Sequence, residues 1–324
     1  MNTRVVDLSV VIPTCDRTEL LRETVKSVLA QTVLPREIIV VDNGDAAPAD
    51  AALSLGDVAI RLVRQEPQGV QAARNAGVAA ATSTWIALLD DDDLYEPDFL
   101  ASCRPALIDA RADIVCTDHR KFDAAGDHAQ TNFAAAPPGY WDGIGDPAAG
   151  WSYVDRFPID RLLHFVPFYP SQLLLRRSLY QQLGGYDVRL RDVVAEDVEF
   201  LVRALGAGTL SIVWSPLLRY RVHAAAHSTG FDAQTWGRWT VFNHLRREAP
   251  ALDPTFATAL ERALPRLRAR AFDAAFGLRR SGDVLALARE LSLGDWTGKR
   301  VVKAALAGLS RGASSFARPA GGAR

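Results

Sequence analysis

"WIALLDDDDLYEP", residues 85–97, joins a short apolar run to four consecutive aspartates. The run over 85–89 is typical of a strand that is buried on both faces of a parallel sheet. In open α/β sheets, ligands bind at the loops that follow the carboxyl ends of such strands, and the aspartates occupy one of these loops. Crowded carboxylates can converge on one hard divalent cation; without an ion, their repulsion favours protonation of one or more of them. The alternative is a solvated acidic turn that caps the next helix.

Strand-like and helix-like segments alternate through the first 120 residues, which is the pattern of parallel βαβ units. We expect strands at 8–12, 37–41, 58–63, 85–89 and 113–116, and helices over 17–31, 69–82 and 97–110. Residues 121–170 are rich in glycine, proline and aromatic side chains and are expected to form an irregular, partly ordered loop region. Further on we expect a strand and a short helix in 171–187, a helix at 195–205, strands at 209–214 and 217–223, and mostly helices after about 230.

Composition narrows the function classes. The 324 residues are 48% hydrophobic and 23% charged, which indicates a soluble globular chain. A net charge of -1 creates no global field that would attract nucleic acid. The cysteines, Cys15, Cys103 and Cys116, lack metal-site spacing and favour reduced thiols in a cytoplasmic protein. No apolar run approaches the roughly 18 residues that a spanning helix needs, and no signal-peptide pattern is visible.

Three further segments offer groups that could meet a nucleotide. "VIPTCDRTELL", 11–21, runs from a strand into a helix whose free N–H groups suit phosphate. "EIIVVDNGD", 37–45, ends a strand with Asp42 and Asn43, which could contact a base edge or a ribose. "GVQAARNAG", 69–77, offers Arg74 as a cation for a phosphate or a neighbouring carboxylate. Taken singly, these segments are also explained by an ordinary connection, an Asn-Gly turn and a surface arginine.

Taken together and in this order, the segments resemble the family 2 glycosyltransferases, whose GT-A fold binds a nucleotide-sugar through a divalent metal. The resemblance covers about 8–223 and rests on "VVIPTCDR", "QTVLPREIIVVDNGD", "ARNAG", "WIALLDDDDLYEPDFL", "GGYD" and "AEDVEFLVRAL". It implies a Rossmann-like, mixed but mostly parallel α/β sheet flanked by helices. The glycosyltransferase domain would span 1–228, with a nucleotide-sugar half at 1–118 and an acceptor half at 119–228. A helical segment and tail, 229–324, would follow.

The resemblance also implies a donor site. The residues that would bind the nucleotide are Pro13, Thr14, Asp16, Asp42, Asn43, Arg74, Asp90 and Asp91. Asn43 and Asp45 depart from the commoner Asp-Gly-Ser pattern, so the pattern identifies the base of the donor less firmly. The expected nucleotide is UDP, with dTDP and GDP as alternatives.

The DXD motif of the family would be Asp90, Asp91 and Asp92, holding Mn2+ or Mg2+. The resemblance makes Asp92 the direct metal ligand, with Asp90 beside it; Asp90 or Asp91 would lie nearer the ribose, and Asp93 would support the site. His223 follows the last expected strand and would complete the metal site. A satisfied surface histidine, or the competing His227, remains an alternative.

The Glu-Asp pair before the helix at 195–205 matches the catalytic-base motif of the family. Asp197 would deprotonate the acceptor hydroxyl while Glu196 helps to position it, which predicts inversion at the anomeric carbon. Dipole capping of the helix also explains the pair. The acceptor is expected to be a glycan, a lipid-linked sugar or a small molecule. "QTWGRW", 234–239, is one residue too long for the QxxRW motif of processive synthases, so we expect transfer of a single sugar.

The last 27 residues contain six basic residues and no acidic one. They could rest at an anionic membrane surface, which would place a cytoplasmic protein peripherally at the inner face; a solvated basic helix with a tail is the alternative. Two rival functions also stay open. A sugar-1-phosphate nucleotidyltransferase would normally carry a glycine-rich basic loop that "PTCDRTELL" lacks, and a non-catalytic nucleotide-sugar or glycan-binding module would not need both the aspartates and the Glu-Asp pair.

Overall fold

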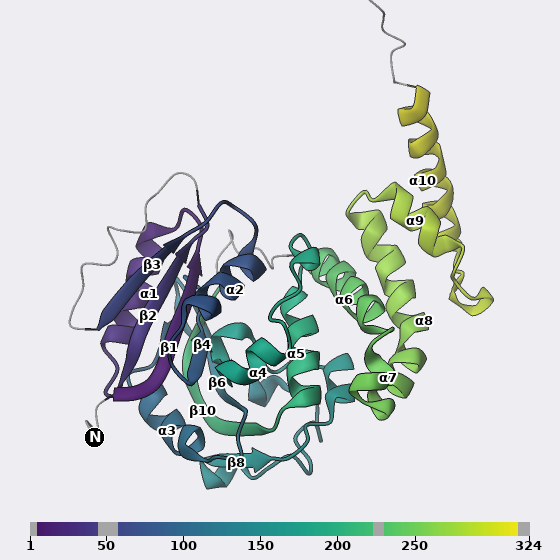
Figure 1. The fold of residues 1–324 in the computed structure, drawn as a ribbon. Helices are drawn as coiled ribbons and strands as arrows, with labels where there is room; N and C mark the ends of the chain where they lie inside the picture. The colour runs from purple at the N-terminus through teal and green to yellow at the C-terminus, as the bar shows by residue number, and fades with distance from the viewer. Residues whose placement is uncertain (1–4, 45–57, 223–229, 317–324) are drawn as a thin grey trace, which may run out of the picture. The chain divides into compact units, whose positions relative to one another are not determined.

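The fold is taken from a computed structural model, which describes residues 5–44, 58–222 and 230–316 (Figure 1). The chain divides into two compact units. The first comprises Met1–Asp192 and Asp197–Ala224, and the second comprises Val193–Glu196 and Ala225–Arg324. In the described part, no helix is long and apolar enough to cross a membrane.

One mixed sheet organises the first unit. Its strands are β1 (Val5–Thr14), β2 (Leu34–Asp42), β3 (Ala59–Arg64), β4 (Trp85–Leu88), β5 (Leu94–Tyr95), β6 (Ile114–Asp123), β7 (Gly126–Thr131), β8 (Trp151–Val154), β9 (Leu173–Arg176) and β10 (Leu210–Arg221). The order is β3-β2-β1-β4-β9-β6-β10-β5, with β7 beside β6 and β8 beside β10. The first four strands in this order are parallel, β9 is antiparallel to both neighbours, and β6 and β10 are again parallel.

Helices follow the strands where the apolar period predicts them. The first unit contains α1 (Thr18–Leu29), α2 (Val70–Ala80), α3 (Phe99–Ile108), α4 (Arg177–Gln182) and α5 (Glu196–Ala207). In α1 the buried positions include Leu21, Val25 and Val28, which form one apolar face against the sheet. In α2 a Cβ on Gly77 would lie 2.3 Å from Cγ1 of Val11, so glycine allows α2 to pack closely on β1.

The second unit is helical, as the sequence predicts. Its helices are α6 (Phe231–Leu245), α7 (Ala249–Leu252), α8 (Pro254–Gly277), α9 (Ser281–Ala288) and α10 (Gly298–Phe316) (Figure 1). The predicted α/β sheet with flanking helices and an appended helical segment is therefore confirmed.

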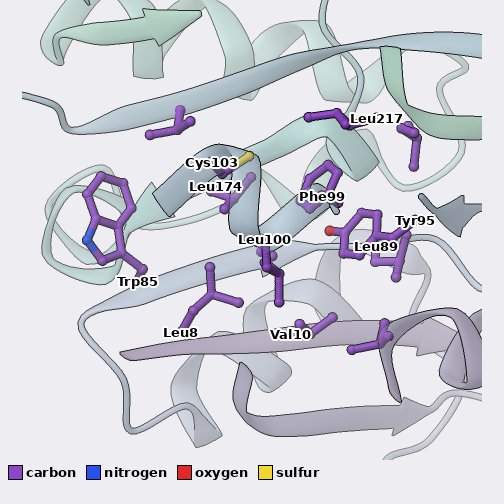
Figure 2. Close-up of a cluster of buried hydrophobic side chains, with 14 of the residues drawn as sticks. Leu8, Val10, Trp85, Leu89, Tyr95, Phe99, Leu100, Cys103, Leu174 and Leu217 are labelled. Atoms are coloured by element: carbon purple, nitrogen blue, oxygen red, sulfur yellow. The ribbon is translucent and has the colours of Figure 1, made fainter. Parts of the chain in front are cut away.

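A continuous apolar core lies between β1, β4 and α3 (Figure 2). It joins Leu8 and Val10 of β1 to Trp85 and Leu89 around β4 and to Phe99 of α3. These side chains are almost completely removed from water, which is the main favourable contribution to folding. The core therefore fixes the end of β4 from which the aspartates emerge.

Two predictions about the second half of the sheet are wrong. The strands expected at 209–214 and 217–223 are one strand, β10, because Pro216 sits at an irregularity in the pairing with β6, where a missing N–H is tolerated. The region 121–170 is not simply irregular: β6 continues to Asp123 and turns into β7, and the Asp123 carboxylate accepts from the Ala125 N–H at 2.8 Å in the turn. Aromatic burial orders the remainder, where Trp141 packs on Phe133.

Candidate active site

The parallel register brings the predicted loops to one edge of the sheet. Thr14 at the end of β1 pairs with Asp42 at the end of β2, and Val11 pairs with Leu88 at the end of β4. The buried Pro13 precedes Thr14 within β1, and the aspartates begin two residues after Leu88. The groups that follow three neighbouring strands therefore meet at the carboxyl edge of the sheet.

The loop after β1 binds the aspartates directly. Thr14 Oγ1 donates to Asp91 Oδ2 at 2.7 Å. Arg17 Nη1 lies 3.1 Å from Asp91 Oδ1 and 2.8 Å from Asp92 Oδ2, so one guanidinium joins two neighbouring carboxylates. These contacts offset part of the repulsion within the aspartate cluster, which we define as Asp90, Asp91, Asp92 and Asp93.

A second arginine reaches the cluster from α2. Arg74 Nη2 lies 2.6 Å from Asp90 Oδ1, and the Arg74 side chain is almost fully buried. The Arg74 guanidinium also lies over the Tyr186 ring, 5.0 Å from its centroid. Of the two alternatives for Arg74, contact with a neighbouring carboxylate is therefore realised in this structure.

The loop after β2 packs against the loop after β1. Asp42 Oδ1 accepts from the Gly44 N–H at 3.2 Å, and Asn43 Oδ1 accepts from Gln65 Nε2 at 2.9 Å. A Cβ on Gly44 would lie 2.5 Å from Asp16 Oδ1, so glycine permits the two loops to touch. Asp16 itself has a φ of 55°, a left-handed conformation that aspartate tolerates better than most residues. The predicted base and ribose residues are thus neighbours in space.

Burial changes the protonation of the cluster. Burial raises the pKa of Asp91 to about 6, although Thr14 and Arg17 act in the opposite direction. Burial, together with the charges of Asp92 and Asp90, raises the pKa of Asp93 well above its usual value. At these two positions the protonated form is favoured by burial first and by repulsion within the cluster second.

The donor atoms of the cluster fit a divalent cation. They are carboxylate oxygens, which Mg2+ and Mn2+ prefer, and Asp90 and Asp92 are more exposed than Asp91. Within the described residues, Asp93 Oδ2 is buried without a hydrogen-bond partner. The predicted third ligand, His223, lies outside the described residues.

Several residues that the sequence prediction did not name hold the cluster in place. The Asp90 N–H donates to Ser171 Oγ at 3.1 Å, the Arg221 N–H donates to Asp93 Oδ1 at 3.0 Å, and Arg221 Nε donates to the Asp92 carbonyl at 2.8 Å. Ser171 and Arg221 are distant in sequence from the aspartates and carry no local signal. Arg17, in contrast, lies beside Asp16 in the segment "VIPTCDRTELL", 11–21.

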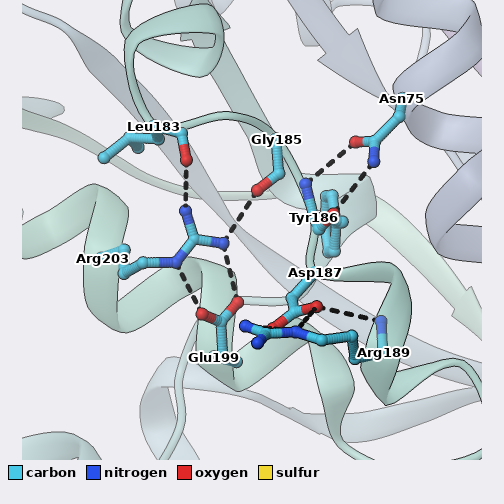
Figure 3. Close-up of polar contacts among 8 residues, drawn as sticks. All are labelled: Asn75, Leu183, Gly185, Tyr186, Asp187, Arg189, Glu199 and Arg203. Atoms are coloured by element: carbon cyan, nitrogen blue, oxygen red, sulfur yellow. Dashed lines mark hydrogen bonds and ion pairs between the residues drawn. The ribbon is translucent and has the colours of Figure 1, made fainter. Parts of the chain in front are cut away.

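The segment "GGYD", 184–187, is held by hydrogen bonds from both α2 and α5 (Figure 3). Asn75 of α2 donates through Nδ2 to the Tyr186 carbonyl and accepts through Oδ1 from the Tyr186 N–H, both at 2.9 Å. Arg203 of α5 donates to the carbonyls of Leu183 and Gly185 at 2.8 Å each. Arg203 also forms a two-point ion pair with Glu199, with distances of 2.6 and 2.7 Å. Because Tyr186 packs on Arg74, these contacts tie α5 to the aspartate cluster.

The predicted catalytic pair lies at the start of α5. Glu196 is the first residue of the helix and belongs to the second unit, whereas Asp197 belongs to the first unit. Asp197 Oδ1 accepts from the N–H of the next residue, Val198, at 3.0 Å, whereas a helix-capping side chain would accept from an N–H two or three residues further on. Ala195, just before the pair, has a φ of 68°. That conformation costs a non-glycine residue about 1–3 kcal/mol and is found preferentially at functional sites.

The mixed, mostly parallel sheet with flanking helices is the GT-A fold of glycosyltransferases. Two solved structures share the fold. The mannosyltransferase PcManGT from Pyrobaculum calidifontis, in complex with GDP-Man and Mn2+, has a TM-score of 0.59 and 21% identity, covering 97% of this chain and 81% of that one. S. aureus TarS in complex with UDP-GlcNAc has a TM-score of 0.62 and 14% identity, covering 87% of this chain and 84% of that one.

Sequence comparison places the chain more narrowly. Residues 9–181 match the model of "Glycosyl transferase family 2", and the chain belongs to this family. It is similar to the PGL/p-HBAD biosynthesis glycosyltransferase Rv2957 of Mycobacterium tuberculosis, with 31% identity over 206 residues, 60% of this chain and 68% of that protein. It is also similar to the succinoglycan biosynthesis protein ExoO of Rhizobium meliloti, with 37% identity over 100 residues, 30% of this chain and 28% of that protein.

Proposed function

We propose that the protein is a metal-dependent, inverting glycosyltransferase that moves one sugar from a nucleotide-sugar to an acceptor hydroxyl. The observation that carries this proposal is the aspartate cluster, which lies at the carboxyl edge of the sheet and in direct contact with Thr14, Arg17 and Arg74. A site that gathers carboxylates and arginines suits a ligand that combines phosphates with a divalent cation.

The donor nucleotide would lie along the loops after β1 and β2. Asp42 and Asn43, next to the loop of Asp16, offer acceptors and donors for a base and a ribose, while Pro13 and Thr14 form the adjacent wall. UDP is the proposed nucleotide of the donor, because TarS was solved with UDP-GlcNAc. GDP is the second candidate, because PcManGT was solved with GDP-Man.

Asp92 and Asp90 would hold the divalent ion, with His223 as a further ligand, and Asp91 would support them or face the ribose. A bound Mn2+ or Mg2+ would neutralise the negative charge that develops on the departing diphosphate. Arg17 and Arg74 pair with these carboxylates and would limit how far they move when the donor binds.

The acceptor hydroxyl would lose its proton to Asp197, which Glu196 helps to position. A base that acts on the face of the sugar opposite to the leaving diphosphate gives inversion at the anomeric carbon. We propose that 119–228 shapes the acceptor side. The acceptor would be a glycan, a lipid-linked sugar or a small molecule, chosen by the loops of this region rather than by the fold.

The test separates donor binding from transfer. Thermal unfolding is measured with UDP, GDP, dTDP and CDP, each with and without Mn2+. A ligand at about 100 times its dissociation constant adds about 2.7 kcal/mol, which raises the melting temperature by roughly 5 °C or more. We expect such a shift with one nucleotide only when the metal is present, and loss of the shift in Asp92→Ala.

Asp197→Asn keeps the shape of the side chain and removes its basicity. We expect this variant to keep the metal-dependent shift in melting temperature. It should release no nucleotide from the sugar donor with any acceptor in a panel. Asp192→Asn is the matched control, because Asp192 is a highly exposed carboxylate shortly before α5. Normal turnover in Asp197→Asn would remove Asp197 as the base, and the absence of any nucleotide shift in the wild type would favour a non-catalytic module that binds glycan.

A further inference from the structure

The last helix of the second unit has an apolar side that faces away from the protein. Large aliphatic side chains on α10 are exposed at Val301 (54%), Val302 (58%) and Leu309 (72%), with Leu306 between them. Eleven large hydrophobic side chains are exposed in the described residues, and five of them lie between Leu293 and Leu309. Exposed aliphatic residues are normal when scattered, but a cluster of this kind marks an interaction surface.

The opposite side of α10 is the one that packs on the protein. Arg300 donates to Asp273 Oδ2 through Nε at 3.1 Å and Nη2 at 2.7 Å, and Lys303 Nζ donates to Asp273 Oδ1 at 2.7 Å. Ala307, one turn further on, is buried. Residues 300, 303 and 307 share one face of a helix, so Asp273 of α8 determines which side of α10 points outward.

The basic residues at the start of α10 divide between its packed side and its exposed side. Two of them, Arg300 and Lys303, are used to hold α10 against α8. The outward face from Val301 to Leu309 is instead aliphatic, and the exposed Lys299 stands near its start. The feature is therefore an amphipathic helix fixed to a folded unit, with its apolar side about half exposed or more.

We propose that this face, defined by Val301, Val302, Leu306 and Leu309, inserts into the surface of an anionic lipid bilayer. An aliphatic face beside the exposed Lys299 suits the boundary between headgroups and acyl chains. Arg300 and Lys303 pair with Asp273, but no acidic residue follows Asp295, so Lys299, Arg311, Arg318 and Arg324 give the end of the sequence a surplus of positive charge in a chain of net charge -1.

Charge also favours a bilayer over a second copy of the chain. Two copies that met through α10 would bring two segments without acidic residues together, and like charges would repel. Stable protein interfaces are rich in aromatic residues and arginine at their centre, whereas this face is composed of valine and leucine. An anionic surface would satisfy both the apolar face and the surplus charge.

Co-sedimentation with vesicles tests the proposal on the full chain and does not depend on glycosyl transfer. The vesicles consist of phosphatidylcholine with or without phosphatidylglycerol, at low and high salt. We expect the wild type to sediment with the vesicles that contain phosphatidylglycerol. The double variant Val302→Gln, Leu309→Gln should bind at least about tenfold more weakly, since each aliphatic side chain contributes appreciably when removed from water.

The substitutions are chosen to leave α10 intact, because glutamine is at least as good a helix former as valine and close to leucine. Ile108→Gln is the matched control: it removes an equally exposed aliphatic side chain, 70% exposed, from the end of α3. Circular dichroism checks helix content. Equal vesicle binding by the double variant, or no binding by the wild type, would overturn the proposal. A wild-type dimer that the double variant splits, with no vesicle binding by either, would assign the face to a second copy.

Discussion

The ion pair between Arg203 and Glu199 gives the sharpest prediction about stability (Figure 3). The Glu199 side chain is 3% exposed and the Arg203 side chain 12% exposed, so both charges are largely withdrawn from water. Arg203→Met keeps most of the apolar stem but leaves the Glu199 carboxylate buried without its cation. Removal of one member of a buried pair typically costs about 3–5 kcal/mol in the free energy of unfolding. We expect a loss in this range.

A double-mutant cycle isolates the charge effect from the lost packing. Glu199→Met together with Arg203→Met removes both charges, so we expect the double variant to be more stable than Arg203→Met alone. Arg246→Met is the surface control. Arg246 forms a similar two-point pair with Glu261, but the two side chains are 47% and 52% exposed, and exposed pairs contribute little to stability.

Urea unfolding followed by circular dichroism measures the wild type, the two single variants Glu199→Met and Arg203→Met, the double variant and the control. The reasoning would be refuted if Arg203→Met cost no more than Arg246→Met, or if the double variant were less stable than Arg203→Met. Because Arg203 also holds the carbonyls of Leu183 and Gly185, we expect Arg203→Met to weaken nucleotide binding as well, through the link from Tyr186 to Arg74.

Two further predictions concern the sheet. Burial lowers the pKa of His119 to about 4, below the value of roughly 6.5 in an unfolded chain, so the unfolded chain binds more protons between these pH values. The free energy of unfolding of the wild type should therefore fall by up to about 3 kcal/mol through this residue as the pH falls from 6.5 to 4. His119→Phe should lack this part of the pH dependence when urea unfolding is measured at each pH. Parallel pH profiles of the two proteins would contradict the prediction. Gly77→Ala places a Cβ 2.3 Å from Val11 and should cost about 1–3 kcal/mol while it displaces Arg74. Gly282→Ala in α9, with no atom within 4 Å of the added Cβ, should cost nothing, and equal melting temperatures for the two variants would count against close packing of α2 on β1.

Local patterns are sufficient for much of this fold because strands and helices bury their apolar residues with different periods. The period of α1 and the apolar run of β4 locate both elements, and four aspartates after a buried strand locate the acidic site before any tertiary information is used. The prediction of β10 as two strands failed because a proline ends a strand in isolation, whereas pairing with β6 absorbs it as an irregularity.

The sequence by itself determined which chemical groups are present and at which strand ends they emerge: the carboxylates of the cluster, the threonine after β1 and the cations that follow. Only the tertiary structure decided the partners. Arg17 and Arg74 reach the aspartates across separations of 74 and 16 residues, and Arg221 across 128. The same holds for α10, where Asp273 decides which side of the helix faces outward. Long-range pairs depend on how elements pack, and no local period records that packing, so the pairing and the pKa values that follow from it emerge only in the folded chain.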